Sequence, residues 1–166
     1  MTVMKWAALA VVLLLLIVLA ALVAGRLGAL AGTPPADLGV RNGRLKPPSR
    51  NENSVSSQAM LYPDHPQRQY AEIAPLQLRG DGPATIAKIA TLVRAASGAE
   101  VVTSAPDYLY ARYTSPLMRY VDDVEFWFDP ANGVVQVRSA SRIGRGDLGA
   151  NRKRIEALRA ALETGR

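Results

Sequence analysis

The sequence VDDVEFWF (residues 121–128) is followed by DPANG (129–133) and VVQVRSASR (134–142). The first and third stretches are rich in β-branched and aromatic residues, which favour strands. The middle stretch contains a proline and ends in Asn-Gly, a combination typical of hairpin turns. We therefore predict an antiparallel β-hairpin over residues 121–142.

The residues before this hairpin predict two more strands and a helix. Short candidate strands cover residues 100–104 and 108–114. Upstream of them, Pro83 follows Asp81-Gly82 and suits the first turn of a helix. Apolar residues then recur at spacings of three and four, which is the period of one helix face: Ile86, Ile89, Ala90 and Val93. Ser97-Gly98 predicts the end of this helix, because glycine commonly follows a helix C-terminus.

The last segment of the chain also predicts a helix. Its apolar residues share one face by their spacing: Leu148, Ile155, Leu158 and Leu162. Asp147 is the candidate N-cap. Arg152 with Glu156, and Arg159 with Glu163, are spaced for i,i+4 ion pairs on the exposed side.

The order helix, strands, helix predicts one α+β domain over residues 51–166. We expect an antiparallel sheet of about four strands, covered on one face by two helices. Residues 51–58 are polar without periodicity, and prolines interrupt residues 62–66, so both segments are expected to be loops.

The N-terminal residues 1–31 predict a membrane anchor or a signal peptide. No charged residue lies between Lys5 and Arg26. The apolar run at 6–24 would span roughly 28 Å as a helix, close to the hydrocarbon thickness of a bilayer. This run is longer than most signal-peptide cores, which favours a retained anchor. Ala29-Leu30-Ala31 is nevertheless a candidate cleavage site, so a cleaved signal is the alternative.

Residues 32–50 are rich in proline, glycine and basic side chains, which predicts an extended, solvated linker. The whole chain is basic, with a formal net charge of +6 and a pI of about 10.0. Residues 138–166 carry eight Lys/Arg against three acids. Such patches attract phosphate on lipid or nucleic acid, although a merely solvated surface is the simpler interpretation. The chain has no cysteine, which excludes disulfides, thiolate metal sites and cysteine nucleophiles.

Three acids, Asp122, Asp123 and Glu125, lie in the first hairpin strand. Alternation places Asp123 and Glu125 on one face and Asp122 on the other. Two carboxylates on one face can hold a hard cation or act as an acid–base pair. The favoured interpretation is an ion-pair network, because the hairpin brings Arg138 and Arg142 of the next strand within reach. The residues thus predict no metal site and no cofactor.

The segment RIGRGDLGAN (142–151) joins a strand to the last helix and contains three glycines. Backbone N–H groups at a helix N-terminus attract anions. We therefore consider an anion site here, with a simple capped turn as the alternative. The candidate binding residues are Arg138, Arg142, Arg145, Asn151 and Arg152. The only histidine, His65, lies in a proline-rich loop and is expected at the surface, so no catalytic residue is assigned.

Several motifs resemble those of an uncharacterised family. They are VDDVEF at 121–126, VRSASRIG at 137–144 and DLGANRKRI at 147–155. NSVSS at 53–57 and Pro75-Leu76 are similar to the opening motif of that family. It is the domain-of-unknown-function family catalogued as fourteen-ninety-nine, found in bacteria and in plastid-bearing organisms.

The resemblance covers about residues 50–162 and implies an envelope or lumenal location, but no activity and no catalytic residues. We expect a non-enzymatic binding or scaffold module with a basic, anion-attracting surface, held in the bacterial inner membrane by one span. Lys5 and the N-terminal amine favour export of the domain to the periplasm. Arg26 and the linker arginines favour the opposite orientation, but most of them lie at or beyond the range in which this bias acts, so export is the expectation and a cytoplasm-facing domain is the alternative. Its expected partners are membrane lipid, through the N-terminal helix, and an anionic lipid or an envelope protein.

Alternative interpretations are a hydrolase or metal-dependent enzyme built on Asp122, Asp123 and Glu125, and a nucleic-acid binder if the domain faces the cytoplasm. The oligomeric state is not predicted.

Overall fold

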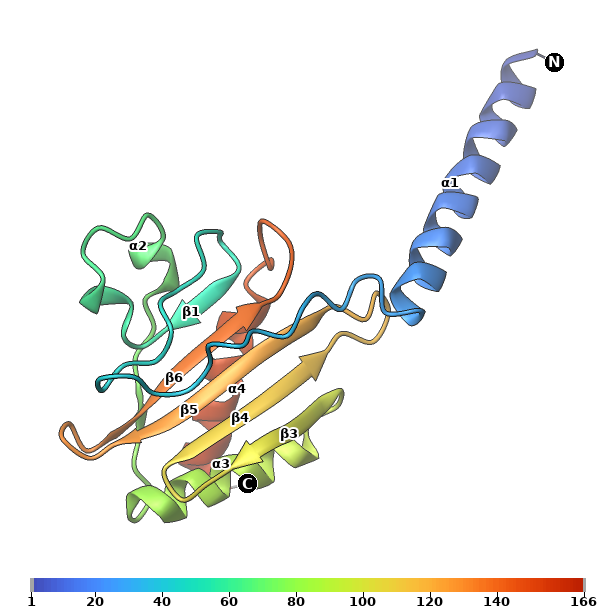
Figure 1. Ribbon diagram of the computed structural model, residues 1–166. Helices are drawn as coiled ribbons and strands as arrows, with labels where there is room; N and C mark the ends of the chain where they lie inside the picture. The colour runs from blue at the N-terminus through green and yellow to red at the C-terminus, as the bar shows by residue number, and fades with distance from the viewer. Residues whose placement is uncertain (1, 166) are drawn as a thin grey trace.

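The computed structural model describes residues 2–165 and has an α+β architecture (Figure 1). Its elements, in chain order, are α1 (Thr2–Arg26), β1 (Ser54–Ser56), the 3-10 helix η1 (Ala59–Leu61), α2 (Arg68–Ala71), β2 (Leu76–Gln77), α3 (Gly82–Ala95), β3 (Ala99–Ser104), β4 (Tyr108–Thr114), β5 (Val121–Asp129), β6 (Val134–Ser141) and α4 (Ala150–Thr164).

The strands form one six-stranded sheet in the order β1-β6-β5-β4-β3, with β2 also paired to β6, and all the strand pairs are antiparallel. β5 and β6 are the predicted hairpin, and β3 and β4 are the two predicted strands before it. The expectation of about four strands is too low, because β1 and β2 complete the sheet along β6. They span three and two residues, too few for alternation to be recognised in the sequence.

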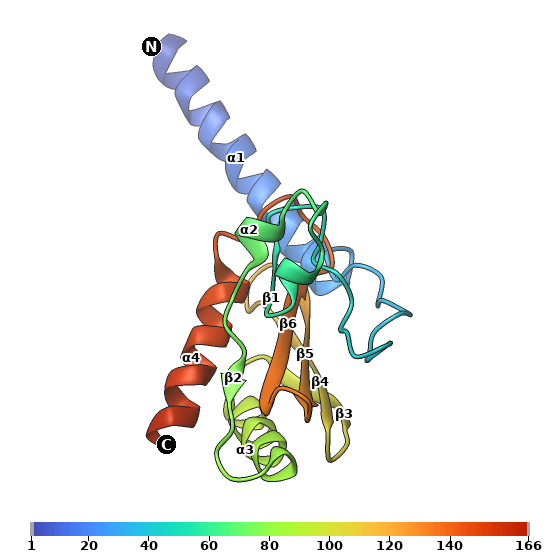
Figure 2. The ribbon, with the colours of Figure 1, turned by 90° about the vertical axis from the view of Figure 1, so that its left-hand side faces the viewer.

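Helices α3 and α4 cover one face of the sheet (Figure 2). α3 begins beside Pro83 as predicted, and Asp81 is its N-cap, whose carboxylate accepts a hydrogen bond of 2.7 Å from the Ala84 amide. The predicted stripe of α3 is buried in the main core with the inward residues of the strands, such as Leu109, Phe126 and Val137. The two predicted helices are therefore present. η1 and α2 add short turns between β1 and β2 that the sequence did not indicate.

The predicted apolar face of α4 is confirmed for Ile155, Leu158 and Leu162, which are buried. It is wrong for Leu148, which is 96% exposed because it lies in the loop before the helix, with a left-handed φ of 52°.

The predicted i,i+4 ion pairs on α4 are also absent from residues 2–165. The Arg152 guanidinium donates to the carbonyl oxygen of Tyr70 at 2.6 Å. The Arg159 guanidinium pairs instead with Glu156 at 2.9 Å, three residues earlier, and also donates to the carbonyls of Ala74 and Pro75. Both arginines thus hold the segment before α3 against α4, because backbone carbonyls there need donors.

α1 projects away from the domain (Figure 1), and its apolar stretch is not buried against the rest of the described chain. α1 is long and apolar enough to cross a membrane. A signal sequence near the N-terminus can have the same length and composition.

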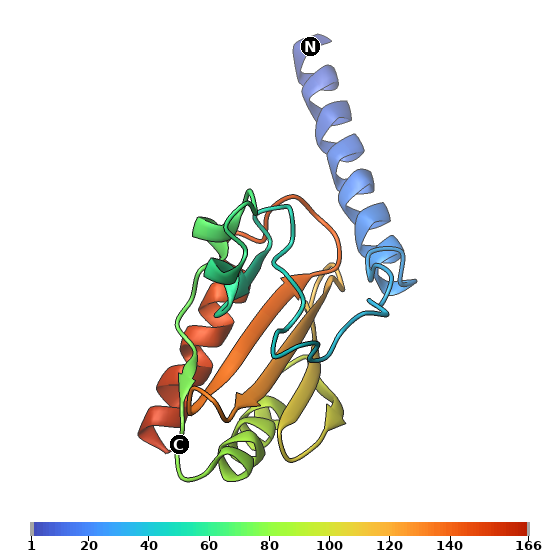
Figure 3. The same cartoon turned by 60° about the vertical axis from the view of Figure 1, so that its left-hand side comes forward.

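The segment after α1 runs across the sheet face opposite α3 and α4 (Figure 3). We call residues 34–49 the strap. The expectation of a solvated linker is wrong here, because the Leu45 side chain is only 1% exposed. The strap also hydrogen-bonds to the sheet, through the Gly39 amide to Glu125 and the Pro47 carbonyl to Arg138. This proline-rich segment lies on the sheet for two reasons. The Leu45 side chain is buried there, and the backbone groups of Gly39 and Pro47 form hydrogen bonds with buried charges.

We predict that Gly98→Ala will destabilise the domain. Gly98 has a φ of +73°, and a Cβ there would lie 2.5 Å from the Thr114 carbonyl oxygen, a backbone atom that cannot rotate away. We expect the unfolding free energy to fall by about 1–3 kcal/mol. Urea unfolding of the full chain in detergent, followed by circular dichroism, measures this loss. The neighbouring Ser97→Ala is the control and should change stability by less than about 0.5 kcal/mol; equal effects of the two variants would contradict the steric argument.

Candidate functional site

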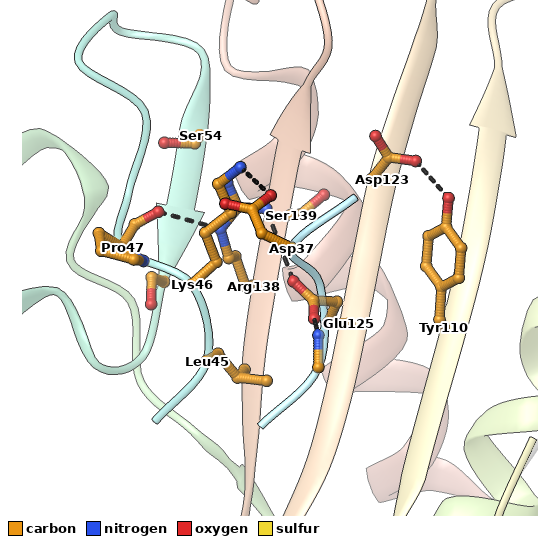
Figure 4. Close-up of polar contacts among 12 residues, drawn as sticks. Asp37, Leu45, Lys46, Pro47, Ser54, Tyr110, Asp123, Glu125, Arg138 and Ser139 are labelled. Atoms are coloured by element: carbon orange, nitrogen blue, oxygen red, sulfur yellow. Dashed lines mark hydrogen bonds and ion pairs between the residues drawn. The ribbon is translucent and has the colours of Figure 1, made fainter. Parts of the chain in front are cut away.

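The sheet face beneath the strap is polar, in contrast to the apolar face beneath the helices. Strand register brings Glu125 opposite Arg138 on β6 and opposite Tyr110 on β4. One step along the strands, Asp123 is opposite Arg112 and Ala140. The predicted alternation is thereby confirmed: Asp123 and Glu125 share this face (Figure 4).

Glu125 is fully buried, with 0% exposure, and lies between the sheet and the strap. Its Oε1 accepts hydrogen bonds from the Gly39 amide at 2.7 Å and from the Tyr108 hydroxyl at 2.8 Å. Its Oε2 has no hydrogen-bond donor among residues 2–165 and lies 3.6 Å from Nη1 of Arg138. Burial raises the pKa of Glu125, against the opposing effects of these donors and of the arginine charge.

Arg138 is the central cation of this face and is 5% exposed. Its Nε donates to the Pro47 carbonyl at 3.2 Å. Within the described chain, its two terminal nitrogens donate no hydrogen bond, and the nearest anionic oxygen is the Glu125 Oε2 at 3.6 Å. Burial lowers the pKa of Arg138, and neighbouring carboxylates counteract that effect. Arg138 is therefore a buried charge whose donors are largely unused.

Asp123 and Arg142 form a second ion pair that is fully satisfied. The guanidinium donates through Nε at 2.9 Å and through Nη2 at 2.8 Å to the two oxygens of the carboxylate. The Tyr110 hydroxyl donates to the same carboxylate at 2.6 Å. These hydrogen bonds raise the pKa of Arg142. Burial, followed by the bond to Asp123, raises the pKa of Tyr110 to about 12.

Asp122 lies on the other face, towards α4. Its carboxylate pairs with Arg154 at 2.6 Å, and that guanidinium stacks over the Tyr113 ring at 4.5 Å. The three acids therefore do not converge on one point. Among residues 2–165, no three His, Cys, Asp or Glu side chains lie close enough together to hold a metal ion.

A cavity of about 390 Å³ lies between the strap and the end of the sheet. Its walls include three cations, Lys46, Arg138 and Arg142, and one carboxylate, Asp123. The strap contributes prolines and Ser49 to the opposite wall. Lys46 pairs with Asp37 at 2.5 Å, with both side chains partly exposed. The cavity therefore combines a buried arginine with a partly exposed lysine.

The five residues considered for an anion site at the start of α4 do not come together. The N-cap of α4 is Gly149 and not the predicted Asp147. The Asp147 carboxylate nevertheless lies at the helix N-terminus, where it accepts from the Gly149 and Asn151 amides, each at 2.9 Å. Burial acts to raise the pKa of Asp147, but hydrogen bonds from Asn151, Tyr70 and Gly149 together lower it. This carboxylate occupies the position that an external anion would take.

The other members of that set lie elsewhere. The Asn151 side chain is buried and donates to the Asn53 carbonyl at 3.1 Å. Arg152 holds the Tyr70 carbonyl, and Arg145 is exposed in the loop. Only Arg138 and Arg142 line a common cavity.

Sequence reasoning missed the contribution of the strap to this site. Gly39, Lys46 and Pro47 all belong to the segment predicted to be solvated. The available signal was the apolar residues Leu38, Val40 and Leu45, which stand among prolines, glycines and charges.

We predict strong coupling between Asp123 and Arg142, which are 2% and 4% exposed at their side chains. Asp123→Leu and Arg142→Met should each lower the unfolding free energy by about 3–5 kcal/mol, because each leaves an uncompensated buried charge. The double variant should lose much less than the sum, since both charges are removed. A double-mutant cycle by chemical denaturation measures this coupling. Additive losses would show that the pair acts as two independent groups.

Comparison with known proteins places the chain in a family. A family model described as "Protein of unknown function (DUF1499)" matches residues 44–162, more than half of the 166-residue chain. This match confirms the resemblance seen in the sequence motifs, and it begins within the strap. No curated protein and no solved structure matches the chain. The chain belongs to the family of proteins of unknown function DUF1499.

Proposed function

We propose that this chain is a membrane-anchored, non-catalytic binding module that holds a small anionic group, a carboxylate or a phosphate, in the cavity beneath the strap. The observation that carries the proposal is Arg138. It is almost completely buried, lines the cavity, and leaves its terminal nitrogens without hydrogen-bond partners in the described chain.

A buried guanidinium with unused donors is energetically unfavourable unless oxygen atoms approach it. Glu125 compensates for part of the charge, but its Oε2 lies 3.6 Å away, beyond good hydrogen-bond distance. An anionic group in the cavity would offer oxygens to the planar guanidinium, the geometry in which arginine binds carboxylates and phosphates most strongly.

The charges around the cavity support the same ligand chemistry. Asp123 is already bound by Arg142 and Tyr110, so it does not compete for Arg138. Lys46 pairs with Asp37 only at the surface, where ion pairs contribute little stability. Lys46 can therefore reorient towards a ligand at small cost.

The alternative, an enzyme built on the three acids, has weaker support. Asp122 lies on the helix side of the sheet, and Glu125 is fully buried and does not line the cavity. Burial does raise the pKa of Glu125, as in many acid–base residues, but its neighbours already use Oε1.

For the compartment, we propose a single-pass protein of the bacterial inner membrane with its domain in the periplasm. The apolar length of α1 supports the membrane span. The charge of Lys5 with the N-terminal amine supports this orientation, and Arg26 at the other end of α1 opposes it. An exported domain would not meet nucleic acid, so the basic surface is better suited to envelope anions.

We predict that a C-terminal alkaline phosphatase fusion will be active in living cells and that a fluorescent-protein fusion at the same position will not fluoresce. The mature N-terminus should begin at or near Met1, as an anchor requires. A mature N-terminus directly after Ala31 would show that residues 1–31 are a cleaved signal peptide and not an anchor. Fluorescence without phosphatase activity would place the domain in the cytoplasm and overturn the proposed compartment.

We predict that inorganic phosphate or acetate raises the melting temperature of the full chain in detergent, compared with chloride at equal ionic strength. The rise should saturate, because a ligand that binds only the folded state stabilises it by mass action. Lys46→Ala should weaken the response. The double variant Glu125→Gln, Arg138→Gln, which keeps the charge balanced, should abolish it.

Lys153→Ala is the matched control, because Lys153 is an exposed cation of α4 away from the cavity. It should leave the response unchanged. If neither anion raises the melting temperature of the wild type, or if the double variant responds as the wild type does, the proposed site is wrong.

A further inference from the structure

The end of the domain next to α1 has an unusual surface. It consists of the turn at residues 115–120, between β4 and β5, and the loop at residues 143–149, between β6 and α4. We call these two segments together the anchor-side end. Figure 1 shows the turn beside the base of α1. Contacts confirm this placement: a Cβ on Gly25 of α1 would lie 2.5 Å from the Met118 carbonyl oxygen. Leu30 lines one cavity together with Tyr120 and Leu148.

The covalent chain keeps this end close to α1. Gly32 approaches the sheet so closely that a Cβ there would lie 2.7 Å from Cβ of Arg142 and 2.9 Å from Cγ2 of Ile143. Only six peptide units separate Arg26 from Gly32, a reach of at most about 20 Å even if fully extended. Residues 27–31 are folded into turns, with hydrogen bonds such as Leu27 N to Val23 O at 3.0 Å. If α1 spans a bilayer, the anchor-side end must therefore lie at its surface.

Large apolar side chains are exposed at this end. Leu148 is 96% exposed, more than any other large apolar residue described, including those of α1. Leu117 is 66% exposed and Tyr120 is 40% exposed. Leu27, just after α1, is 82% exposed. Such a group is unfavourable in water but suits the interface of a membrane, where leucine and tyrosine side chains insert among headgroups.

The backbone also presents these side chains outward at an energetic cost. Leu148 and Arg119 have left-handed φ angles of 52° and 60°, which residues with a Cβ rarely adopt. Neither side chain gains core packing in return, because both are exposed. Strain without packing inside the domain is typical of a segment shaped by an outside contact.

The charge at this end complements anionic lipid. Arg26, Arg119 and Arg145 are exposed, and none has an acidic partner within ion-pair distance in the described chain. Of the acids near them, Asp122 is bound by Arg154 and Asp147 by the start of α4. The third, Glu52, whose backbone bridges to Gly146, is exposed, so the three arginines leave a net positive charge at this end. Exposed arginines beside exposed leucines are the combination by which peripheral segments bind anionic bilayers.

We infer that the anchor-side end is a second membrane contact: Leu117, Tyr120 and Leu148 insert into the interface of the bilayer that holds α1, and Arg119 and Arg145 bind anionic headgroups there. This inference rests on the proposed membrane anchorage and goes beyond it, because it places the domain against the bilayer instead of leaving it on a free tether. The cavity beneath the strap then keeps a constant distance from the membrane surface.

The chain contains no cysteine, so single-cysteine variants label at one position only. We would attach an NBD fluorophore to Leu148→Cys in the full chain, reconstituted in nanodiscs of mixed zwitterionic and anionic phospholipid. Lipids with a nitroxide near the headgroup should quench this label, and its emission should shift to the blue. Ala131→Cys, in the turn between β5 and β6, is the matched control and should show neither effect. Leu19→Cys, in α1, should be quenched by nitroxides on the acyl chains.

A second pair of variants keeps Leu148 unlabelled. A label on Leu117→Cys should be quenched by the same headgroup nitroxides, and adding Leu148→Ser or the double change Arg119→Ala, Arg145→Ala should reduce that quenching. If the labels at 148 and 117 are quenched no more than the label at 131 while the label at 19 is quenched, the second contact does not exist although the anchor does. If the label at 19 is not quenched either, the anchorage itself is wrong and the inference falls with it.

Discussion

A buried glutamate and a buried arginine face each other across neighbouring strands, and neither fully satisfies the other. Glu125 and Arg138 are 0% and 5% exposed, and their closest charged atoms are 3.6 Å apart. In a low-dielectric environment such groups need additional hydrogen bonds. The strap supplies them, from the Gly39 amide to the carboxylate and from the Pro47 carbonyl to the guanidinium. The segment that leaves the anchor is thus held on the sheet by polar contacts, with Leu45 as its main apolar contribution.

On both faces of β5, buried carboxylates likewise have hydrogen-bond or ion-pair partners. On the strap side, Asp123 is bound by Arg142 and Tyr110; on the helix side, Asp122 is bound by Arg154. Asp129, the fourth acid of β5, accepts hydrogen bonds from Asn132 and Gln136. A strand with four acids therefore lies in the centre of the sheet with all four carboxylates buried. Arg138 is the exception, because it lines a cavity and, within the described chain, donates a hydrogen bond through Nε alone. That difference separates the structural ion pairs from the candidate ligand site.

Much of the fold could be predicted from periodicity and turn chemistry. The β5–β6 hairpin, β3, β4 and α3 lie where strand composition, Asn-Gly, Pro83 and the apolar period of the helix indicated, because each is determined by residues within or next to itself. The short strands β1 and β2 could not be predicted, since their pairing to β6 is a property of the sheet edge and not of three or two residues. The strap was mistaken for solvent-exposed chain because its interactions are mainly backbone hydrogen bonds to distant acids and arginines.

The candidate site was predicted only in part. Arg138 and Arg142 were identified from the sequence, but Lys46 and the cavity could not be, because they depend on the path of the strap. The loop before α4 was misread because its glycines and arginines suggested an anion site, although Asp147 had been identified as a candidate cap. Its carboxylate occupies the position that an anion would take.

The position of the strap along the chain has a mechanical consequence. It lies in series between α1 and β1, so a force that pulls the domain away from its anchor enters at Gly32 and passes along the strap before it reaches the sheet. The first contacts under load are the close approach of Gly32 to Ile143 and the single hydrogen bonds at Gly39 and Pro47. These yield one after another, whereas the paired strands of the six-stranded sheet resist together. We therefore expect the wall of the cavity that the strap provides to detach under tension before the core between α3, α4 and the sheet is loaded.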